Sequence, residues 1–111
     1  MTKLALFVRL EAKPGQEAAL ADFLASALPL ANAESGTTAW FALKFGPSTF
    51  GVFDAFADDA GRQAHLNGQL AAALMANAAT LLSSPHNIEK VELLPAKLPA
   101  CQPRLDPISS C

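Results

Sequence analysis

The stretch TTAWFALKFGPSTFGVFDAF, residues 37–56, decides the fold, because it predicts two strands that are apolar on both faces. In the first strand Trp40 and Ala42 point to one side, and further apolar residues point to the other. In the second strand Asp54 shares its face with three apolar side chains, those of Phe50, Val52 and Phe56. Side chains alternate across a strand, so an antiparallel sheet with one wet face reads apolar-polar. Both faces of this hairpin therefore need cover.

The flanking segments predict one helix or strand after another. Residues 3–10 alternate as a strand, and residues 16–28 show helical spacing of their large apolar side chains. Pro29 lacks an N–H group, so we expect the helix to kink or break near Leu28, with a short continuation to Ala33. The remaining pattern predicts a turn at 34–36, helices over 58–66 and 69–82, and a last strand over 87–94.

This order of strand, helix, strand, strand, helix, strand predicts the α+β class. It is the ferredoxin-like βαββαβ unit, with an antiparallel four-stranded sheet. We expect residues 1–95 to form this domain and residues 96–111 to form a Pro-rich C-terminal arm, which is either a disordered end or an extended segment laid across a partner. Cys101 and Cys111 both lie in the arm, where they are either reduced or paired.

Composition indicates self-association. The chain has 111 residues, of which 51% are apolar and 16% charged, against a usual charged share of about 25%. One subunit of this length supplies helices for one sheet face only, so we expect the other face to close on a second subunit or around an apolar ligand. The net charge of -2 and the lack of a basic cluster argue against a nucleic-acid partner.

Two apolar stretches raise the question of a membrane or a signal peptide. The uncharged stretch 63–88 is interrupted by polar residues, so it does not form a spanning helix. The first apolar run contains Arg9 and Glu11, and no small-residue cleavage site follows, which favours a strand over a signal peptide. We therefore expect a cytoplasmic protein with no membrane partner.

Three segments carry a resemblance to a known family. They are the first strand leading into KPGQE at 13–17, the ESG turn at 34–36, and the run FGVFDAFADDAGRQAHLNG at 50–68. Over residues 4–94 the chain resembles the antibiotic biosynthesis monooxygenase-like family, the dimeric α+β barrels. The resemblance implies a homodimer whose sheets pack face to face, and a cofactor-independent monooxygenase acting on a small aromatic or quinol-like molecule. The alternative is a non-catalytic small-ligand-binding or structural dimer of the same fold.

The family's haem-degrading branch uses an Asn, a Trp and a His at positions that hold Phe7, His65 and Ala73 here. Alanine cannot ligate iron, so no haem is expected. The oxygenases' strand-end Trp and the Tyr of that strand correspond to Phe56 and Phe53. The chain has no tyrosine, so the pocket lacks a phenolic acid or base. We expect no cofactor and no metal.

His65 is the candidate catalytic residue, because imidazole titrates near neutral pH and can take a proton from a phenol. It also falls on the Ala-His-Leu of the resemblance. The alternative is a structural histidine bonded to a backbone group or a carboxylate. His86, next to Pro85, is expected to be an ordinary surface residue.

The candidate substrate-binding residues are aromatic or charged side chains of the predicted strands. Trp40 also suits a place in the core or in the dimer interface, which is the commoner use of a large ring. Asp54 is a charge within an apolar strand, and we expect it to pair across the sheet with a strand arginine or to orient a substrate. The substrate-binding set is Trp40, Phe7, Phe53, Phe56 and Arg9.

Overall fold

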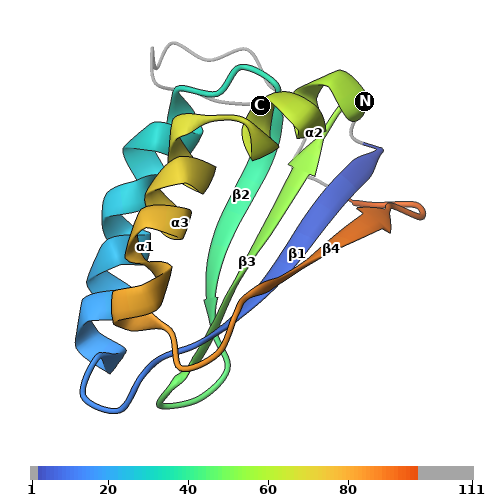
Figure 1. Ribbon diagram of the computed structural model, residues 1–111. Coiled ribbons are helices and arrows are strands. Elements are labelled where there is room, and N and C mark those ends of the chain that lie inside the picture. Colours follow the sequence, from blue (N-terminus) through green and yellow to red (C-terminus); the bar gives the residue numbers. More distant parts are fainter. Residues whose placement is uncertain (1–2, 98–111) are drawn as a thin grey trace, which may run out of the picture.

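The computed structural model of the protein describes residues 3–97. Cys101 and Cys111, and all but the first two residues of the predicted arm, lie outside this range. The element types and their order confirm the prediction (Figure 1). The strands are β1 (Leu4–Glu11), β2 (Thr37–Lys44), β3 (Thr49–Phe56) and β4 (Asn87–Glu92), and the helices are α1 (Glu17–Asn32), α2 (Asp59–Leu66) and α3 (Gln69–Leu81).

The four strands form one antiparallel sheet in the order β2-β3-β1-β4. In the central pair Leu6 of β1 lies opposite Asp54 of β3, and on its other side opposite Lys90 of β4. On β2, Trp40 is the residue opposite Asp54. This is the predicted ferredoxin-like arrangement, and its register places Asp54 in the middle of the sheet.

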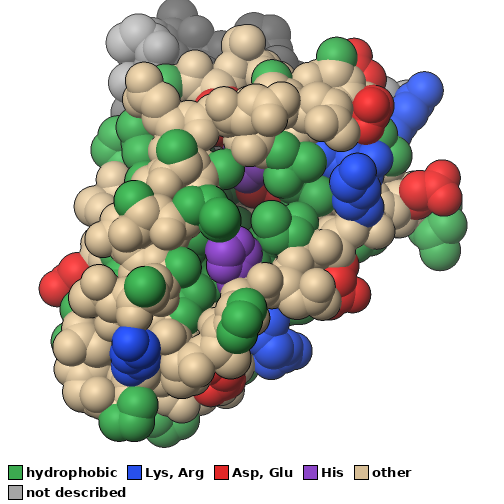
Figure 2. All heavy atoms as spheres, viewed as in Figure 1, with side chains coloured by type: hydrophobic (Ala, Val, Ile, Leu, Met, Phe, Trp, Pro, Cys, Tyr) green, Lys and Arg blue, Asp and Glu red, His purple; other side chains and the backbone are tan. Residues whose placement is uncertain are grey.

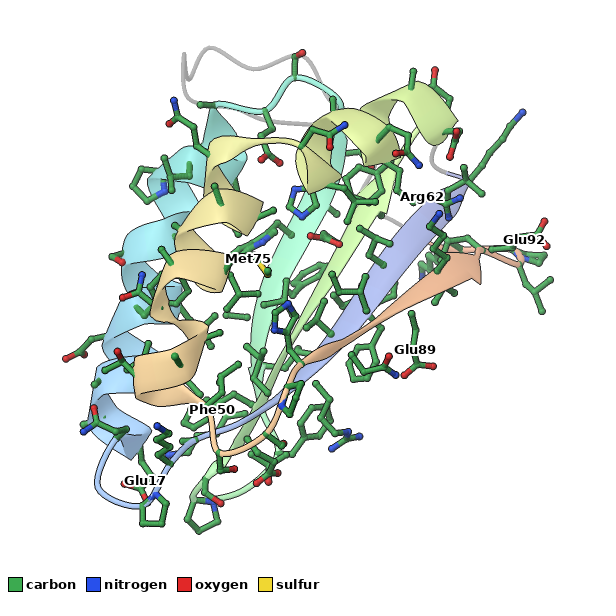
Figure 3. The ribbon with its side chains drawn as sticks, in the orientation of Figure 1. Glu17, Phe50, Arg62, Met75, Glu89 and Glu92 are labelled. Carbon is green, nitrogen blue, oxygen red and sulfur yellow. The ribbon has the colours of Figure 1, made fainter. Side chains whose placement is uncertain are left out.

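The helices lie on one face of this sheet (Figure 1). Helices α1 and α3 pack against each other over β2 and β3, while α2 contacts one end of the sheet. The core between the layers is formed by alternate strand residues and by leucines of the helices, and Figure 3 shows Phe50 of β3 at the lower end of this layer. Fully burying such a side chain stabilises the fold by roughly 1.5–3 kcal/mol. The buried cluster comprises Val8, Leu10, Ala12, Leu20, Leu24, Phe50, Val52, Leu81 and Leu82.

The opposite face of the sheet is here called the outer face. It is apolar, as the sequence of residues 37–56 predicts for both faces of the hairpin. Phe41 and Phe45 are 51% and 52% exposed on it. The ring of Phe45 meets that of Phe7 edge-on at 6.2 Å between centroids, and the Arg9 guanidinium lies 4.5 Å from the Phe45 centroid. Glu89 of β4 points away from the helices (Figure 3). No helix of residues 3–97 covers the outer face.

One expectation about the helices is wrong in part. The chain stays helical nearly to Ala33, as expected, but α1 does not break near Leu28 and runs through Pro29 to Asn32. Proline lacks an N–H group, so a helix that contains it loses one hydrogen bond. Pro29 lies close to the end of α1, where the Ala33 N–H donates to the Pro29 carbonyl oxygen at 3.1 Å. The buried Ala31, beyond the proline, belongs with Ala27 and Leu70 to a cluster against which Trp40 packs, and this packing helps to hold the last turn in place.

The helices also bear on the question of a membrane. None of those within residues 3–97 is long and apolar enough to cross a membrane. Figure 2 shows that charged side chains are sparse over α1 and α3 and lie mostly toward the edges of this face.

Candidate functional site

Helix α2 positions His65. The helix begins at an N-cap, where the Asp58 side chain accepts a hydrogen bond of 2.9 Å from the Gly61 N–H. This cap satisfies one of the free N–H groups of a helix that is only eight residues long. His65 is the one buried residue of α2, with 7% of its surface exposed. Its ring lies against that of Phe56, at 5.3 Å between centroids.

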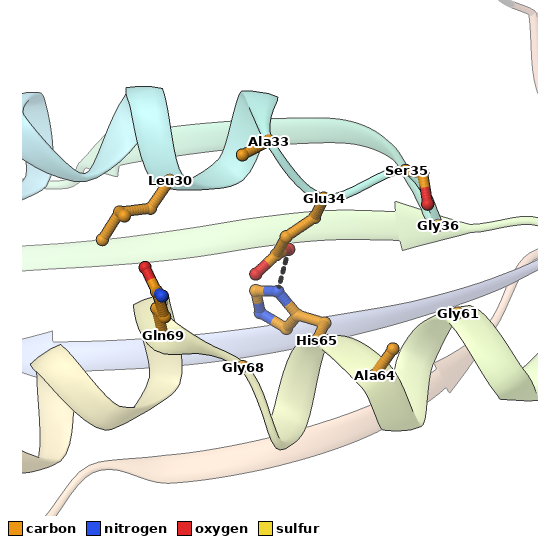
Figure 4. Close-up of a pocket in the computed structure, with 10 residues that line it drawn as sticks. All are labelled: Leu30, Ala33, Glu34, Ser35, Gly36, Gly61, Ala64, His65, Gly68 and Gln69. Atoms are coloured by element: carbon orange, nitrogen blue, oxygen red, sulfur yellow. Dashed lines mark hydrogen bonds and ion pairs between the residues drawn. The ribbon is translucent and has the colours of Figure 1, made fainter.

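The imidazole of His65 lies between two carboxylates. Its Nδ1 atom is 2.6 Å from Oε1 of Glu34, which follows the end of α1 (Figure 4). Its Nε2 atom is 2.9 Å from Oδ2 of Asp54, which is 1% exposed on the helix-covered face of β3. Thr37 fixes Glu34 in turn, because its hydroxyl donates to Oε1 at 2.7 Å. Three segments that are distant in sequence therefore meet at one ring.

The charge of His65 follows from this geometry. Burial by itself lowers the pKa of the imidazole, but the hydrogen bonds and charges of Asp54 and Glu34 outweigh burial and raise the pKa of His65 to about 9. At neutral pH both ring nitrogens are thus protonated, and each donates to a carboxylate. The expectation that His65 titrates near neutral pH is wrong. The alternative, a histidine bonded to carboxylate, describes its contacts correctly.

The group Asp54–His65–Glu34, here called the acid–histidine cluster, carries a net charge of -1 when the ring is protonated. Within residues 3–97 no protein group bonds the second oxygens of its two carboxylates, Oδ1 of Asp54 and Oε2 of Glu34, although both atoms are buried. Buried polar atoms are mostly hydrogen-bonded in native proteins. The cluster therefore has unused capacity to accept hydrogen bonds.

A cavity of about 390 Å³ opens beside His65, between the end of α1, the α2 helix and the start of α3 (Figure 4). This volume lies within the range of roughly 300–1,000 Å³ that is usual for small-molecule sites. Of the described residues that form its wall, Glu34 and His65 alone have ionisable side chains, and the rest are small, apolar or uncharged. The lining residues are Leu30, Ala33, Glu34, Ser35, Gly36, Gly61, Ala64, His65, Gly68 and Gln69.

The predicted substrate-binding residues do not lie together. Trp40 and Phe56 are on the helix-covered face, where Phe56 supports the His65 ring and Trp40 packs against α1. Phe7, Phe53 and Arg9 have the opposite parity in the register, so they lie on the outer face. The sheet separates these three residues from His65, so the five cannot line one pocket with it.

The expected pairing of Arg9 with Asp54 is also wrong. Arg9 is exposed and lies over the Phe7 and Phe45 rings at 5.7 and 4.5 Å, whereas Asp54 is buried against His65. Successive residues of a strand point to opposite faces, and Arg9 lies opposite Gly51 rather than Asp54. The partner of Asp54 comes from a helix instead.

A second cavity, of about 400 Å³, contains the other histidine. His86 lies half-buried on its wall, with Met75 and Leu82 of the α3 side among its neighbours. Figure 2 shows a hollow between α3 and the β4 side of the sheet that is bordered mainly by hydrophobic side chains. Among residues 3–97 no three metal-ligating side chains are placed to hold a metal ion.

The contact of Glu34 with His65 and the true partner of Asp54 were missed by the sequence analysis. A signal existed for Asp54, because an acid on the core-facing side of an apolar strand needs a buried partner. Glu34 carried a weaker signal, since an acidic residue in a turn is ordinarily solvated. Only the fold brings it to His65, which is 31 residues away.

Comparison with solved structures shows the class of fold. Two proteins named as putative antibiotic biosynthesis monooxygenases share it. The one from Nitrosomonas europaea is 15% identical, with a TM-score of 0.74 over 83% of this chain and 90% of that chain. The one from Caulobacter crescentus is 13% identical, with a TM-score of 0.73 over 85% and 92%. At these identities the likeness shows a shared fold alone.

A much nearer relative is a protein of unknown function from Nitrosomonas europaea, which is 96% identical. Its crystal structure superposes with a TM-score of 0.88 over 90% of this chain and 97% of that chain. The chain belongs to the same family as that protein. No protein-family model matches the chain, and no curated protein matches it either.

Proposed function

We propose that the protein is a cofactor-independent monooxygenase that acts on a small, neutral aromatic molecule with a hydroxyl group, bound in the cavity beside His65. The observation that carries this proposal is the acid–histidine cluster, since it supplies buried charge and, from Glu34, an unpaired carboxylate oxygen at a cavity wall. The fold shared with proteins named as antibiotic biosynthesis monooxygenases supports the reaction type.

In this proposal Glu34 accepts the proton of the substrate hydroxyl. The positive charge of His65 stabilises the resulting phenolate, because opposite charges attract strongly where water is excluded. The phenolate then reacts with O₂. A phenol and O₂ give a quinone and water, so one oxygen atom enters the product and the substrate supplies all four electrons. The balance requires no cofactor.

The charge of the cavity wall favours one kind of ligand. Among residues 3–97 no lysine or arginine lines the cavity, and the acid–histidine cluster is net negative with a protonated ring. A carboxylate or phosphate would be repelled there, whereas a neutral hydroxyl can donate to a carboxylate. We therefore expect phenols to bind in preference to benzoates of the same size.

A non-catalytic binding protein is the second candidate, and one observation favours it. Both nitrogens of His65 are bonded, so the ring offers no free basic nitrogen at neutral pH. The site is then a rigid, charged wall that recognises a hydroxyl group without turnover.

The experiment that separates these candidates compares 1-naphthol with its methyl ether, which has the same rings but no hydroxyl donor. Binding is followed by calorimetry under nitrogen, and turnover by oxygen consumption. The monooxygenase predicts binding and consumption of one O₂ per naphthol, with a rate that falls roughly 10²–10⁴-fold in Glu34→Gln. Binding without oxygen consumption supports the second candidate. Equal binding of naphthol and ether would contradict both.

The outer face supports a proposal about assembly. Its exposed phenylalanines form an apolar surface that one subunit does not cover, and we propose that a second copy of the chain covers it in a homodimer. The acid–histidine cluster lies on the other side of the sheet, so each subunit would keep its own cavity.

A further inference from the structure

Two glycines touch where the turn after α1 meets α2. A Cβ atom placed on Gly61 would lie 2.8 Å from the Gly36 carbonyl oxygen, and one placed on Gly36 would lie 2.8 Å from the Gly61 Cα. Ordinary contacts of a Cβ atom begin at 3.4 Å. The obstructing atoms belong to the backbone, so they cannot rotate away as the end of a side chain can.

Neither glycine is required by its backbone conformation. Among residues 3–97 the one glycine with a positive φ angle is Gly15, so Gly36 and Gly61 serve to save space. Gly61 also lies inside a helix, where glycine is about 1 kcal/mol less favourable than alanine. The sequence therefore keeps a poor helix former at the point of closest approach.

The contact between Gly36 and Gly61 lies next to the acid–histidine cluster and joins the same two segments. Gly61 and His65 are four residues apart on α2, so they lie one above the other on the same helix face. Gly36 and Glu34 belong to the same turn, which the Thr37 N–H closes by bonding the Glu34 carbonyl oxygen at 3.2 Å. The glycine contact and the 2.6 Å bond from Glu34 to His65 are thus consecutive contacts between the same two segments.

A third glycine lies at the cavity end of this arrangement. A Cβ atom on Gly68 would lie 3.2 Å from Oε2 of Glu34 and 3.1 Å from the Ala64 carbonyl oxygen. Here the nearer obstruction is backbone, but the carboxylate of Glu34 is also touched. All three glycines line the cavity, and Figure 4 shows them around Glu34 and His65.

We propose that Gly36 and Gly61 are positioning residues of the site, whose close contact brings Glu34 within bonding distance of His65. The proposal rests on the proposed function in one respect: in that function the positive charge of His65 stabilises the phenolate. A methyl group at either position must move the turn from α2, which lengthens the Glu34–His65 bond and weakens the support for the proton.

The test measures the titration of His65 by NMR of its ring nitrogens in the intact protein, without substrate, in Gly61→Ala and Gly36→Ala. Gly46→Ala is the matched control, because a Cβ atom there meets nothing within 4 Å. We expect the titration midpoint to fall by about one pH unit or more in both variants and to stay unchanged in the control. A destabilised but unshifted Gly61→Ala would show a merely structural contact and would overturn the proposal.

If both variants fail to fold, Gly68→Ala takes their place. It presses on Glu34 itself, and it should likewise lower the midpoint; an unchanged midpoint there would also overturn the proposal. Because the measurement needs no turnover, its outcome is independent of whether naphthol is oxidised. A lowered midpoint in a protein without oxygenase activity would leave this inference intact and defeat only the proposed reaction.

Discussion

Nε2 of His65 and Oδ2 of Asp54 lie 2.9 Å apart, so a helix residue and a central strand residue form a charged pair inside the protein. The side chains of both are almost fully buried. Such a pair has a moderate net effect on stability while intact, because burial of the charges offsets their attraction. Removal of one member is different, since the other remains buried without its counter-charge.

His65→Ala should therefore be strongly destabilising. The substitution leaves Asp54 and Glu34 next to each other without the cation between them, and the expected loss in free energy of unfolding is about 3–5 kcal/mol. Urea denaturation of the two proteins measures it. His86→Ala is the control, because His86 has no comparable pair of carboxylates, and it should change stability by about 0.5 kcal/mol or less. Equal effects of the two substitutions would refute a buried charged cluster.

The stability should also depend on pH in the alkaline range. The pKa of His65 is raised from 6.5 to about 9 in the folded protein, so its contribution is fully present below pH 6.5 and is lost as the pH rises through 9. A shift of this size corresponds to a loss on the order of 3 kcal/mol. Urea denaturation at a series of pH values from 6 to 9.5 checks this.

His65→Gln is the comparison for the pH series. The variant lacks the imidazole, so the decrease in its free energy of unfolding at alkaline pH should be only what the other ionisable groups contribute. A decline of the same size in wild type and variant would assign the effect to those other groups.

The elements could be predicted from the sequence because each depends on local pattern. The apolar strands within residues 37–56, the helical spacing of residues 16–28 and the turn at 34–36 place these elements within a few residues. The unbroken passage of α1 through Pro29 could not be predicted, since the packing of the cluster that contains Ala31 acts against the local preference of proline. Tertiary contacts override propensity in this way in many helices.

The site was predictable only in part. His65 was found by its residue type and its place in the sequence, but its pKa depends on Glu34 and Asp54, which only the fold brings to it. The same applies to Arg9, whose parity relative to Asp54 requires the strand register. Register and long-range pairing are set by the whole sheet, so a local pattern does not contain them.

Assembly is tested through the outer face. We expect wild-type protein to sediment as a dimer, or a multiple of it, at micromolar concentration, because the second sheet face is apolar and uncovered. Phe41→Asp places a charge on the exposed apolar part of that face, on β2, and should give monomers. Met75→Asp is the control, since Met75 is 65% exposed but lies on α3, on the other side of the sheet. A wild-type monomer would contradict the assembly that we propose.

Haem should not bind at a defined site. The position that supplies the iron ligand in the haem-degrading branch is Ala73, and both nitrogens of His65 are engaged by carboxylates. A haem titration followed by absorbance should therefore show no saturable change at one haem per subunit. A saturable Soret shift at that ratio, lost in His65→Gln, would show that the ring is available for a metal.

The charged state of His65 is the centre of this account, and NMR of the ring nitrogens measures it directly. With only two histidines in the chain, the His65 signals are assigned by their loss in His65→Gln. At pH 7.5 both His65 nitrogens should be protonated, and the titration midpoint should lie at about 9. A midpoint at or below 6.5, with a single neutral tautomer at pH 7.5, would contradict the buried acid–histidine cluster and the function built on it.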